Sequence, residues 1–436
     1  MYALVDGNNF YVSCERAFRP ALKTRPVVVL SNNDGCAISR SNEAKALGIK
    51  MGAPWFSCRE LAEEHGVVAL SANFSLYGDM SNRMMGIAAG LGPGQEIYSI
   101  DESFVDMTGI RGDLVKRGQE MRLRILQWTG IPTGIGIGPT KTLAKLANFV
   151  AKSADRKPGS FPADLARVCN LAALPTSDFD AVLAATNVDE VWGIGRRIAA
   201  QLNAEGITNV HQLVQIDPAT VRRRWSVVLE RTVRELQGQQ CIALEDQPPA
   251  KKEIAYTRSF GEPIEDLHNL IQAVTEFASG AAAKLRAQAG LAGKIYVFVH
   301  TSPFRKNDRQ YSNGITVPLR RPTSDSGLLV TAAVLGLRTI YREGFRFVKA
   351  GVMLVDLQGA DGHSRSQQVE LDLDQAPEGR ATLMNAVDTL NDRFGRGTVL
   401  LASAGLEGKD RMWTMRQSLL TPQYTTRWND IPTAKA

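Results

Sequence analysis

The chain has 436 residues, a formal net charge of +6 at pH 7 and a sequence pI near 9.0, a basic balance that favours a polyanionic partner. This length indicates roughly two to four domains, and 44% hydrophobic with 22% charged residues is a soluble, globular composition without an apolar run of about 18 residues that would span a membrane. The start, MYALVDGNNF, lacks the regions of a secretion signal, and the five cysteines are spread without a CxxC pair, which argues against disulfides or a zinc site and fits the cytoplasm.

Residues 1–164 alternate strand-like and helix-like stretches. Their patterns predict strands at 1–6, 26–30 and 133–138, helices at 10–18, 42–49, 113–129 and 140–154, and a hairpin around residue 101. This order has no strict βαβ repeat. It therefore favours an α+β sheet with helices on one face over a doubly wound fold.

Changes in composition divide the rest of the chain. Residues 165–238 are predicted to form short helices with basic faces such as VRRRW, and residues 239–253 contain the linker QPPAKKE. Residues 254–357 show a new α/β pattern, with strands in IAYTRSF, KIYVFVHTS and VKAGVMLVDL and helices near 267–289 and 325–342. Residues 358–436 are polar, then helical, and end in a tail containing SLLTPQYTTRWND.

Two adjacent acids, Asp101 and Glu102, lie between the short strand-like runs EIYSI and SFVDM. On a regular strand their side chains would point to opposite faces, but at a hairpin tip both carboxylates can lean to one side. Two carboxylates in one place repel each other unless a cation or a proton lies between them. The alternative interpretation is a solvated acidic turn.

Asp6 ends the first strand, where an acid is most often a turn former or a helix cap. A central strand would instead deliver Asp6 beside the hairpin tip, and three converging carboxylates would need divalent cations. Such oxygen ligands suit Mg²⁺ bound through substrate phosphates, and two ions support in-line nucleotidyl transfer. Phe10 and Tyr11 follow Asp6. Either both rings pack in the core, or one of them faces away from the core and covers the ligand of the acids.

Candidate phosphate ligands follow in CAISRSNEAKALG, which carries Ser39, Arg40, Asn42 and Lys45. A hydroxyl, an amide and a cation that share a helix face can hold a triphosphate. The alternative is an ordinary solvated helix face.

The stretch TGIGIGPTKTLAKLANFVAKSA is not a Walker loop, because Thr140 rather than Gly precedes Lys141. Its alternate glycines are expected to let a helix or another backbone lie close to the strand. In the following helix, Leu143, Leu146, Ala147 and Val150 form the predicted buried stripe. Three lysines are predicted on its other side: Lys141, Lys145 and Lys152. A lysine stripe of this kind is usually solvated. Lys152 could instead reach a phosphate.

The segment VWGIGRRIAAQL places Gly193 and Gly195 just before a helix, with Arg196 and Arg197 in its first turn. Exposed amides at a helix N-terminus bind anions, and arginines there oppose the helix dipole, which indicates an external phosphate partner. The pattern is typical of a helix-hairpin-helix that grips the DNA backbone. An ordinary helical hairpin with a basic surface is the alternative.

Taken in order and at their distances, five segments resemble the Y-family translesion DNA polymerases: LVDGNNFYVSCE, VVVLSNNDGCAISRSNEAKALGIKMG, YSIDESFVDMTG, GIGIGPTKTLAKLAN and VWGIGRR. LSNNDGC, LERTVRELQG, TSPF and YTTR resemble its UmuC-type members, the catalytic subunits of bacterial DNA polymerase V and their plasmid-borne relatives. The resemblance covers nearly the whole chain. It implies a DNA-directed DNA polymerase that synthesises past damaged bases with low fidelity in the SOS response.

The same resemblance implies a right-hand architecture. Its expected parts are a ferredoxin-like palm with small fingers in residues 1–164, a helical thumb with a helix-hairpin-helix in 165–238, a linker in 239–253, an α/β little finger in 254–357 and a partner-binding region in 358–436.

By resemblance, Asp6, Asp101 and Glu102 would hold two Mg²⁺ ions with the help of the Gly7 carbonyl. Tyr11 would be the steric gate that excludes a ribose 2′-hydroxyl. The residues implied to contact the incoming dNTP are Phe10, Tyr11, Ser39, Asn42, Lys45 and Lys152. Position 42 departs from the family pattern, since many relatives carry a tyrosine there.

The implied partners are primer–template DNA, a cleaved UmuD dimer, a RecA filament and the sliding clamp, with a nucleoid-associated place in the cytoplasm and no membrane. Clamp-binding peptides of this family pair a Gln with downstream leucine and an aromatic residue. Here QVELDLDQ, residues 368–375, has acids beside its leucines and no aromatic residue, so this motif is degenerate. Two other hypotheses stay open: a self-sufficient Y-family polymerase and a non-catalytic DNA-binding scaffold.

Overall fold

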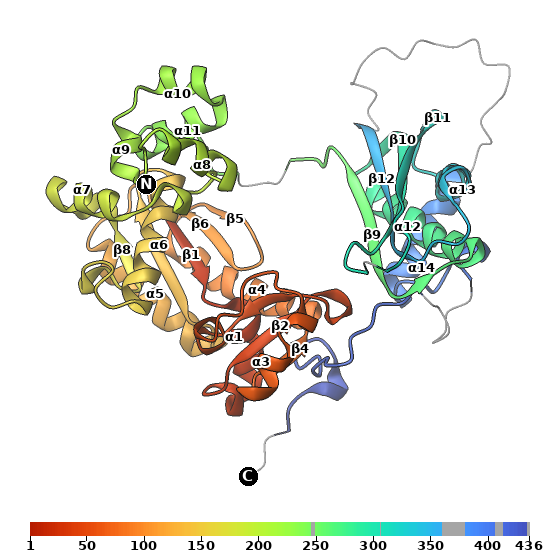
Figure 1. Cartoon of the computed structure of the whole chain (residues 1–436), viewed down its shortest axis with the longest axis horizontal. Helices are drawn as coiled ribbons and strands as arrows, with labels where there is room; N and C mark the ends of the chain where they lie inside the picture. Colours follow the sequence, from red (N-terminus) through yellow and green to blue (C-terminus); the bar gives the residue numbers. More distant parts are fainter. Residues whose placement is uncertain (246–248, 306, 360–379, 406–412, 434–436) are drawn as a thin grey trace. The chain divides into compact units, whose positions relative to one another are not determined.

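A computed structural model of the chain describes residues 1–245, 249–305, 307–359, 380–405 and 413–433 (Figure 1). These form two compact units. The first comprises residues 1–31, 35–248 and 419–436, and the second comprises residues 32–34 and 249–418. Among the described helices, none has the length and hydropathy needed to cross a membrane.

The main sheet of the first unit has five strands in the order β5-β6-β1-β7-β8. Their bounds are Gln95–Ile97, Glu102–Asp106, Tyr2–Gly7, Thr133–Gly138 and Val168–Asn170. The central strand β1 is antiparallel to both of its neighbours, β6 and β7, whereas β7 and β8 are parallel. The sheet is therefore mixed and not the parallel sheet of a doubly wound fold.

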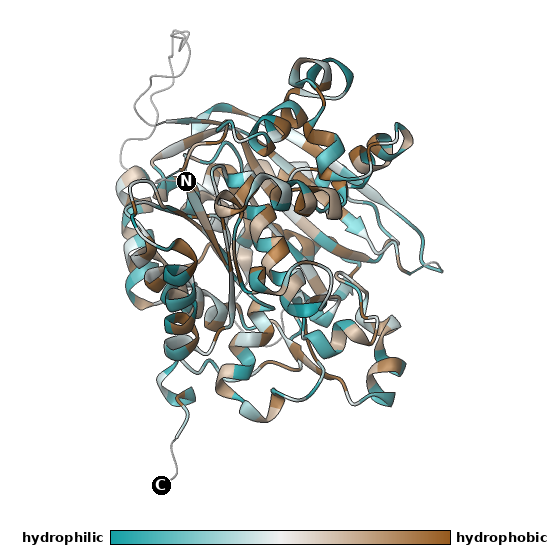
Figure 2. Cartoon of the chain, turned by 90° about the vertical axis from the view of Figure 1, so that its left-hand side faces the viewer, coloured by the Kyte–Doolittle hydropathy of each residue, from teal (hydrophilic) through white to brown (hydrophobic). Residues whose placement is uncertain are grey.

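Helices cover both faces of this sheet. Ala3 and Val5 of β1 pack in the core formed with α4 (Phe74–Ala88) and α5 (Leu114–Thr129). Leu4 points to the other face, where Ala144 of α6 (Lys141–Arg156) packs against it. Every residue of β1 is buried, so the expectation of helices on one face is wrong. Figure 2 shows the helices of this unit with hydrophobic and hydrophilic residues alternating around them, as amphipathic packing requires.

The alternate glycines of β7 bring α6 against the sheet, as expected. A Cβ atom added to Gly136 would lie 2.1 Å from the Asn148 backbone nitrogen, and one added to Gly138 would lie 2.8 Å from the Leu143 carbonyl carbon. Only glycine permits this approach. The close packing determines where the polar side chains of α6 lie relative to β1.

We expect Gly136→Ala to lower the free energy of unfolding by about 3 kcal/mol, because the added methyl group meets backbone atoms that cannot rotate away. The same variant should impair DNA synthesis, since α6 must shift. Gly86→Ala is the matched control: Gly86 lies in α4 with open space around it, and alanine there should stabilise the helix by about 0.5–1 kcal/mol. Denaturant unfolding of both variants measures the difference, and equal stabilities would contradict the packing argument.

A smaller three-stranded sheet has the order β3-β2-β4, with bounds Ala37–Arg40, Val27–Leu30 and Val68–Ser71. Helix α1 (Phe10–Phe18) leads into it from β1, and α2 (Asn42–Ala46) and α3 (Arg59–Glu64) follow its strands. Val28, Leu30 and Trp55 belong to its core. This part carries the side chains of CAISRSNEAKALG.

Five short helices follow β8: α7 (Thr176–Ala185), α8 (Arg196–Ala204), α9 (Val210–Val214), α10 (Pro218–Arg224) and α11 (Val227–Leu236). They share a core with one side of α6, and this core includes Val150, Leu202, Leu213 and Val233. Helix α6 thus joins this helical part to the main sheet.

The second unit contains a four-stranded antiparallel sheet in the order β11-β10-β12-β9, with bounds Ser312–Thr323, Gly290–Thr301, Phe347–Gly359 and Ile254–Ile264. Helices α12 (Leu267–Ala287) and α13 (Ser326–Ile340) pack on one face. A further helix, α14 (Arg380–Phe394), is tied to α12 by an ion pair between Arg286 and Asp388. Strand β11 was not predicted, because its two prolines and its polar residues do not give a strand pattern; at the edge of a sheet they are tolerated.

Candidate active site

The two adjacent acids lie at a hairpin, as predicted. Strands β5 and β6 pair with Ile97 opposite Ser103, and the backbone amides of Tyr98 and Ser99 both donate to the Glu102 carbonyl at 3.1 Å. Asp101 is therefore the last residue of the connecting loop, and Glu102 is the first residue of β6.

Strand β1 brings Asp6 to the same place. Asp6 is the direct cross-strand partner of Glu102, and the Gly7 amide donates to the Asp101 carbonyl at 2.8 Å. Cross-strand partners project to the same face of a sheet, which here is the face covered by α6. The three acids predicted from distant parts of the sequence are thus neighbours at one edge of the sheet.

Two lysines of α6 pair with two of these three carboxylates, Asp6 and Glu102. Lys152 forms an ion pair with Asp6, and the Lys145 ammonium donates to both carboxylate oxygens of Glu102 at 2.9 and 3.1 Å. In the part of the chain that the structure describes, no group of three acidic, His or Cys side chains already forms a metal cage. The carboxylate oxygens themselves fit a hard divalent cation. The ammonium groups of Lys145 and Lys152 compensate the negative charge of Glu102 and Asp6.

Asp6 is buried, with 8% of its surface exposed. Burial raises the pKa of its carboxyl group, while the nearby Lys152 opposes that rise. The Asn148 side-chain amide donates to Asp6 Oδ2 at 3.0 Å. Asn148 was missed in the sequence, although its spacing from Lys145 and Lys152 on one helix face was a signal for it.

The prediction that Lys141 lies on a solvated face of α6 is wrong. Lys141 is 2% exposed, forms an ion pair with Glu96 and lies 5.1 Å from the ring centroid of Phe104. Its side chain is enclosed because α6 is covered by the sheet on one side and by the helical part on another. Lys145 is also held, 4.5 Å from the Tyr98 ring centroid and 5.3 Å from that of Trp192.

A cleft of about 350 Å³ opens beside the acids. It is lined by eight of the predicted site residues: Asp6, Gly7, Phe10, Tyr11, Ser39, Lys45, Asp101 and Lys152. It is also lined by Arg40, which belongs to the segment with the candidate phosphate ligands, and by five residues that were not predicted: Asn9, Ile38, Met51, Ile100 and Arg156. Glu102 and Asn42 do not line it, but Asn42 accepts a hydrogen bond at 3.0 Å from Asn9, whose side-chain oxygen in turn accepts one from Lys45.

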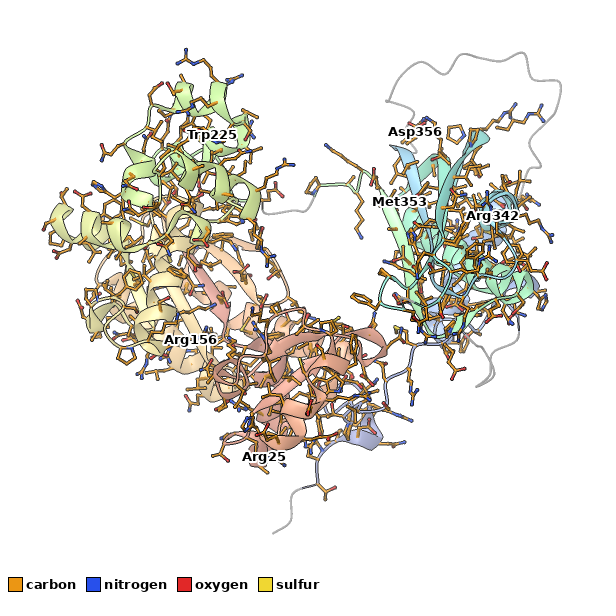
Figure 3. All side chains as sticks on the ribbon, in the orientation of Figure 1. Arg25, Arg156, Trp225, Arg342, Met353 and Asp356 are labelled. Carbon is orange, nitrogen blue, oxygen red and sulfur yellow. The ribbon has the colours of Figure 1, made fainter. Side chains whose placement is uncertain are left out.

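Four cationic side chains gather at this cleft: Arg40, Lys45, Lys152 and Arg156. Figure 3 labels Arg156, at the end of α6. Burial, and then the charges of Arg156, Arg40 and Lys152, lower the pKa of Lys45 to about 8. Four cationic side chains so close together repel one another, which makes the cleft electrostatically suited to an anion.

The two adjacent aromatic residues, Phe10 and Tyr11, have different surroundings: one packs in the core and the other borders the cleft. Phe10 is 3% exposed and packs in the core, with its ring 2.9 Å from where a Cβ of Gly7 would lie. Tyr11 is half-buried, and its ring stacks on that of Tyr77 with centroids 4.5 Å apart. Burial and the charge of Asp101 raise the pKa of the Tyr11 hydroxyl.

The glycine turn before α8 lies outside this cleft. Gly193 has a positive φ of 89° and Gly195 is the N-cap of α8, so the predicted turn and helix start are present. Arg196 and Arg197 are exposed. A one-turn 3-10 helix, Val188–Glu190, precedes the turn.

In the second unit, one face of the sheet is left open by α12 and α13. Strand β10 alternates buried Ile295, Val297 and Val299 with partly exposed residues on the other face. There Phe298 lies between Tyr296 and His300, with ring centroids 5.9 and 4.8 Å away. Aromatic rings with nearby cations are typical of a nucleic-acid surface, and the ammonium of Lys349 lies 5.9 Å from the Phe298 centroid.

Family models match three parts of the chain. Residues 5–148 match the impB/mucB/samB family, residues 251–373 match the C-terminal domain of that family, and residues 381–434 match a domain of unknown function, DUF4113. Protein UmuC of Salmonella typhimurium strain LT2 is 46% identical over 99% of both chains, and Protein ImpB of Salmonella typhimurium is 43% identical over 100% of both.

Solved structures have the same fold. A Y-family DNA polymerase chimera of Dbh and Dpo4 matches with a TM-score of 0.63 at 19% identity, over 82% of this chain and 99% of that one. An insertion ternary complex of Dbh DNA polymerase matches with a TM-score of 0.53 at 18% identity, over 81% of this chain and 98% of that one. With the full-length relatives, these matches show that the chain belongs to the impB/mucB/samB family, as a UmuC-like Y-family DNA polymerase.

Proposed function

We propose that this polymerase performs error-prone, template-directed synthesis past damaged bases by two-metal nucleotidyl transfer at the edge of β1 and β6. One observation carries the proposal. Asp6 pairs with Glu102 across the sheet, Asp101 adjoins Gly7, and a cleft lined by cations lies beside them. Carboxylates for metal ions next to cations for phosphates are what nucleotidyl transfer requires.

Asp6, Asp101 and Glu102, with the Gly7 carbonyl, would hold two Mg²⁺ ions. Ions held there would supply activation of the primer 3′-hydroxyl and stabilisation of charge on the phosphates. Ser99 already orients Asp101, because its hydroxyl donates to Asp101 Oδ1 at 2.6 Å.

The incoming dNTP would place its triphosphate among the cations of the cleft. Ser39 is buried at its wall, and Lys45 and Lys152 are the amines that would meet the phosphates. A triphosphate gives Lys152 a second anionic partner beside Asp6. Asn42 would act through Asn9, which it holds beside Lys45. Tyr11 would be the steric gate, with Phe10 supporting the floor of the cleft.

The pKa of Lys45 leads to a prediction about nucleotide affinity. Lys45 loses its proton near pH 8 in the nucleotide-free protein, and a triphosphate binds the protonated form better. The KM for dNTP should therefore rise above about pH 8, by at most about tenfold per pH unit. In Lys45→Arg the cation stays protonated, so this rise should disappear, whereas the exposed control Lys50→Arg should keep the parent profile. An alkaline rise that persists in Lys45→Arg would rule out Lys45 as its source.

Primer–template DNA would be held through charge. In the first unit the exposed arginines of α8, Arg196 and Arg197, and the amides after Gly193 and Gly195 are suited to backbone phosphates in the manner of a helix-hairpin-helix. In the second unit the open aromatic and basic face of the sheet is suited to DNA. These roles assign a palm and fingers to residues 1–164, a thumb to 165–238, a linker to 239–253 and a little finger to 254–357.

The same proposal includes the damage-response partners: a cleaved UmuD dimer, a RecA filament and the sliding clamp. Residues 358–436 would contact these partners. The polymerase would act in the nucleoid of the cytoplasm. The degenerate clamp peptide, residues 368–375, lies outside the described residues. Primer extension across an abasic site, with Mg²⁺ and with or without cleaved UmuD and a RecA filament, tests this. Bypass only with the partners is expected, and bypass without them would show a self-sufficient polymerase.

A further inference from the structure

The C-terminal tail packs on the first unit next to α4. The Ser71 amide of β4 donates to the Leu419 carbonyl at 3.0 Å, and the Leu419 amide donates to the Ser71 hydroxyl at 3.0 Å. The Asn73 side-chain amide, buried at the start of α4, donates to the carbonyl and hydroxyl oxygens of Thr421 at 3.2 and 3.1 Å. Tyr424 stacks on Phe18 of α1, with centroids 4.8 Å apart. The tail is thus held at three places.

From this position Thr421 reaches a buried carboxylate. Glu15 of α1 has no exposed surface, and its Oε1 accepts a hydrogen bond from the Thr421 hydroxyl at 3.1 Å and another from the Tyr77 hydroxyl at 2.7 Å. Its second oxygen, Oε2, has no hydrogen-bond partner among the described residues. Burial raises the pKa of Glu15, and the two hydroxyl donors oppose that rise. A buried acid with so few donors depends strongly on each of them.

Tyr77 connects this acid to the cleft. Its ring stacks on that of Tyr11 at an interplanar angle of 14°, while its hydroxyl is held by Glu15. Phe74 packs edge-on against both rings, with centroids 6.0 Å from Tyr11 and 6.3 Å from Tyr77. Because Tyr77 is fully buried, its orientation determines the surface on which the Tyr11 ring rests.

We infer that Thr421, Glu15 and Tyr77 are positioning residues for Tyr11, so that the C-terminal tail takes part in sugar selection. The inference rests on the proposed role of Tyr11 as the steric gate. The tail hydroxyl fixes Glu15, Glu15 fixes the Tyr77 hydroxyl, and the Tyr77 ring fixes Tyr11. When one hydroxyl is lost, the Tyr11 ring blocks a ribose 2′-hydroxyl less consistently, while deoxyribose, which has no such group, is little affected.

The test compares kcat/KM for dNTP with kcat/KM for the matching rNTP in the full-length polymerase. Thr421→Val removes the hydroxyl that donates to Glu15 and accepts from Asn73, and it should lower this ratio by about three- to tenfold, the usual net effect of lost hydrogen bonding. Tyr77→Phe should lower the ratio similarly. In the double variant the ratio should fall by less than the product of the two single effects, because both changes disturb one chain of contacts. Thr421→Ser should restore the parent ratio.

Thr425→Val is the matched control in the same tail. The Thr425 hydroxyl is buried without a hydrogen-bond partner among the described residues, so its loss should leave the ratio unchanged. A change that destabilised the tail in general would move both threonine variants together.

Tyr11→Ala, measured alongside, separates the two ideas. If Tyr11→Ala lowers the ratio and both Thr421→Val and Tyr77→Phe keep the parent value, the positioning role is overturned and the gate stands. If Tyr11→Ala leaves the ratio unchanged, the gate fails and this inference fails with it. Should Thr421→Val not fold, as judged by circular dichroism, Tyr77→Phe decides, since its ring and the tail are both retained.

Discussion

Replacing Asp101 and Glu102 together by alanine is expected to reduce primer extension by at least about 1,000-fold, or about 4 kcal/mol in the activation barrier. Both carboxylates lie at the hairpin beside Asp6, and the variant would keep one acid of three to hold the metal ions. Single-turnover extension of a labelled primer on undamaged template, with Mg²⁺, measures the loss directly.

The matched control is Glu63→Ala with Glu64→Ala, an adjacent and exposed acid pair in α3, which should extend primers like the parent. Asp101→Asn with Glu102→Gln keeps the side-chain shapes, and should be as inactive as the alanine pair while still binding primer–template DNA. Extension at the parent rate by either acid-deficient variant would refute the catalytic assignment and support the non-catalytic scaffold.

Tyr11→Ala is expected to lower discrimination against ribonucleotides by on the order of 100-fold, because removing a steric clash of about 2–3 kcal/mol equalises the two sugars. The Tyr11 ring lines the cleft with the acids and rests on Tyr77. The ring therefore has a defined position from which it can block a ribose 2′-hydroxyl. Incorporation of matched dNTP and rNTP opposite the same template base gives the ratio.

Tyr11→Phe distinguishes the ring from the hydroxyl. It keeps the ring and its stacking surface, so a steric mechanism predicts discrimination close to that of the parent. A fall in discrimination as large in Tyr11→Phe as in Tyr11→Ala would instead assign the selection to the hydroxyl and would exclude a purely steric gate.

Local sequence determined much of the arrangement of Asp6, Asp101 and Glu102. Strand-like apolar runs on both sides of two acids favour the hairpin at Asp101, because a polar pair between two strand patterns is typical of a turn. The glycine at every second position of β7 specified a close approach, since nothing but glycine leaves room for it. Asp6 at a strand end, followed by a helix, completed the set of three acids. Their expected roles as metal ligands came from the family resemblance.

Only the tertiary structure decided which polar side chains meet. Lys141 and Lys152 look alike in the sequence, yet one is buried against Glu96 and the other pairs with Asp6. Their difference arises from what packs around α6, and helical spacing does not contain that information. For the same reason no local pattern connects Thr421 with Glu15, which is 406 positions away. Contacts between segments so distant are set by the burial of whole elements, which the folded chain alone determines.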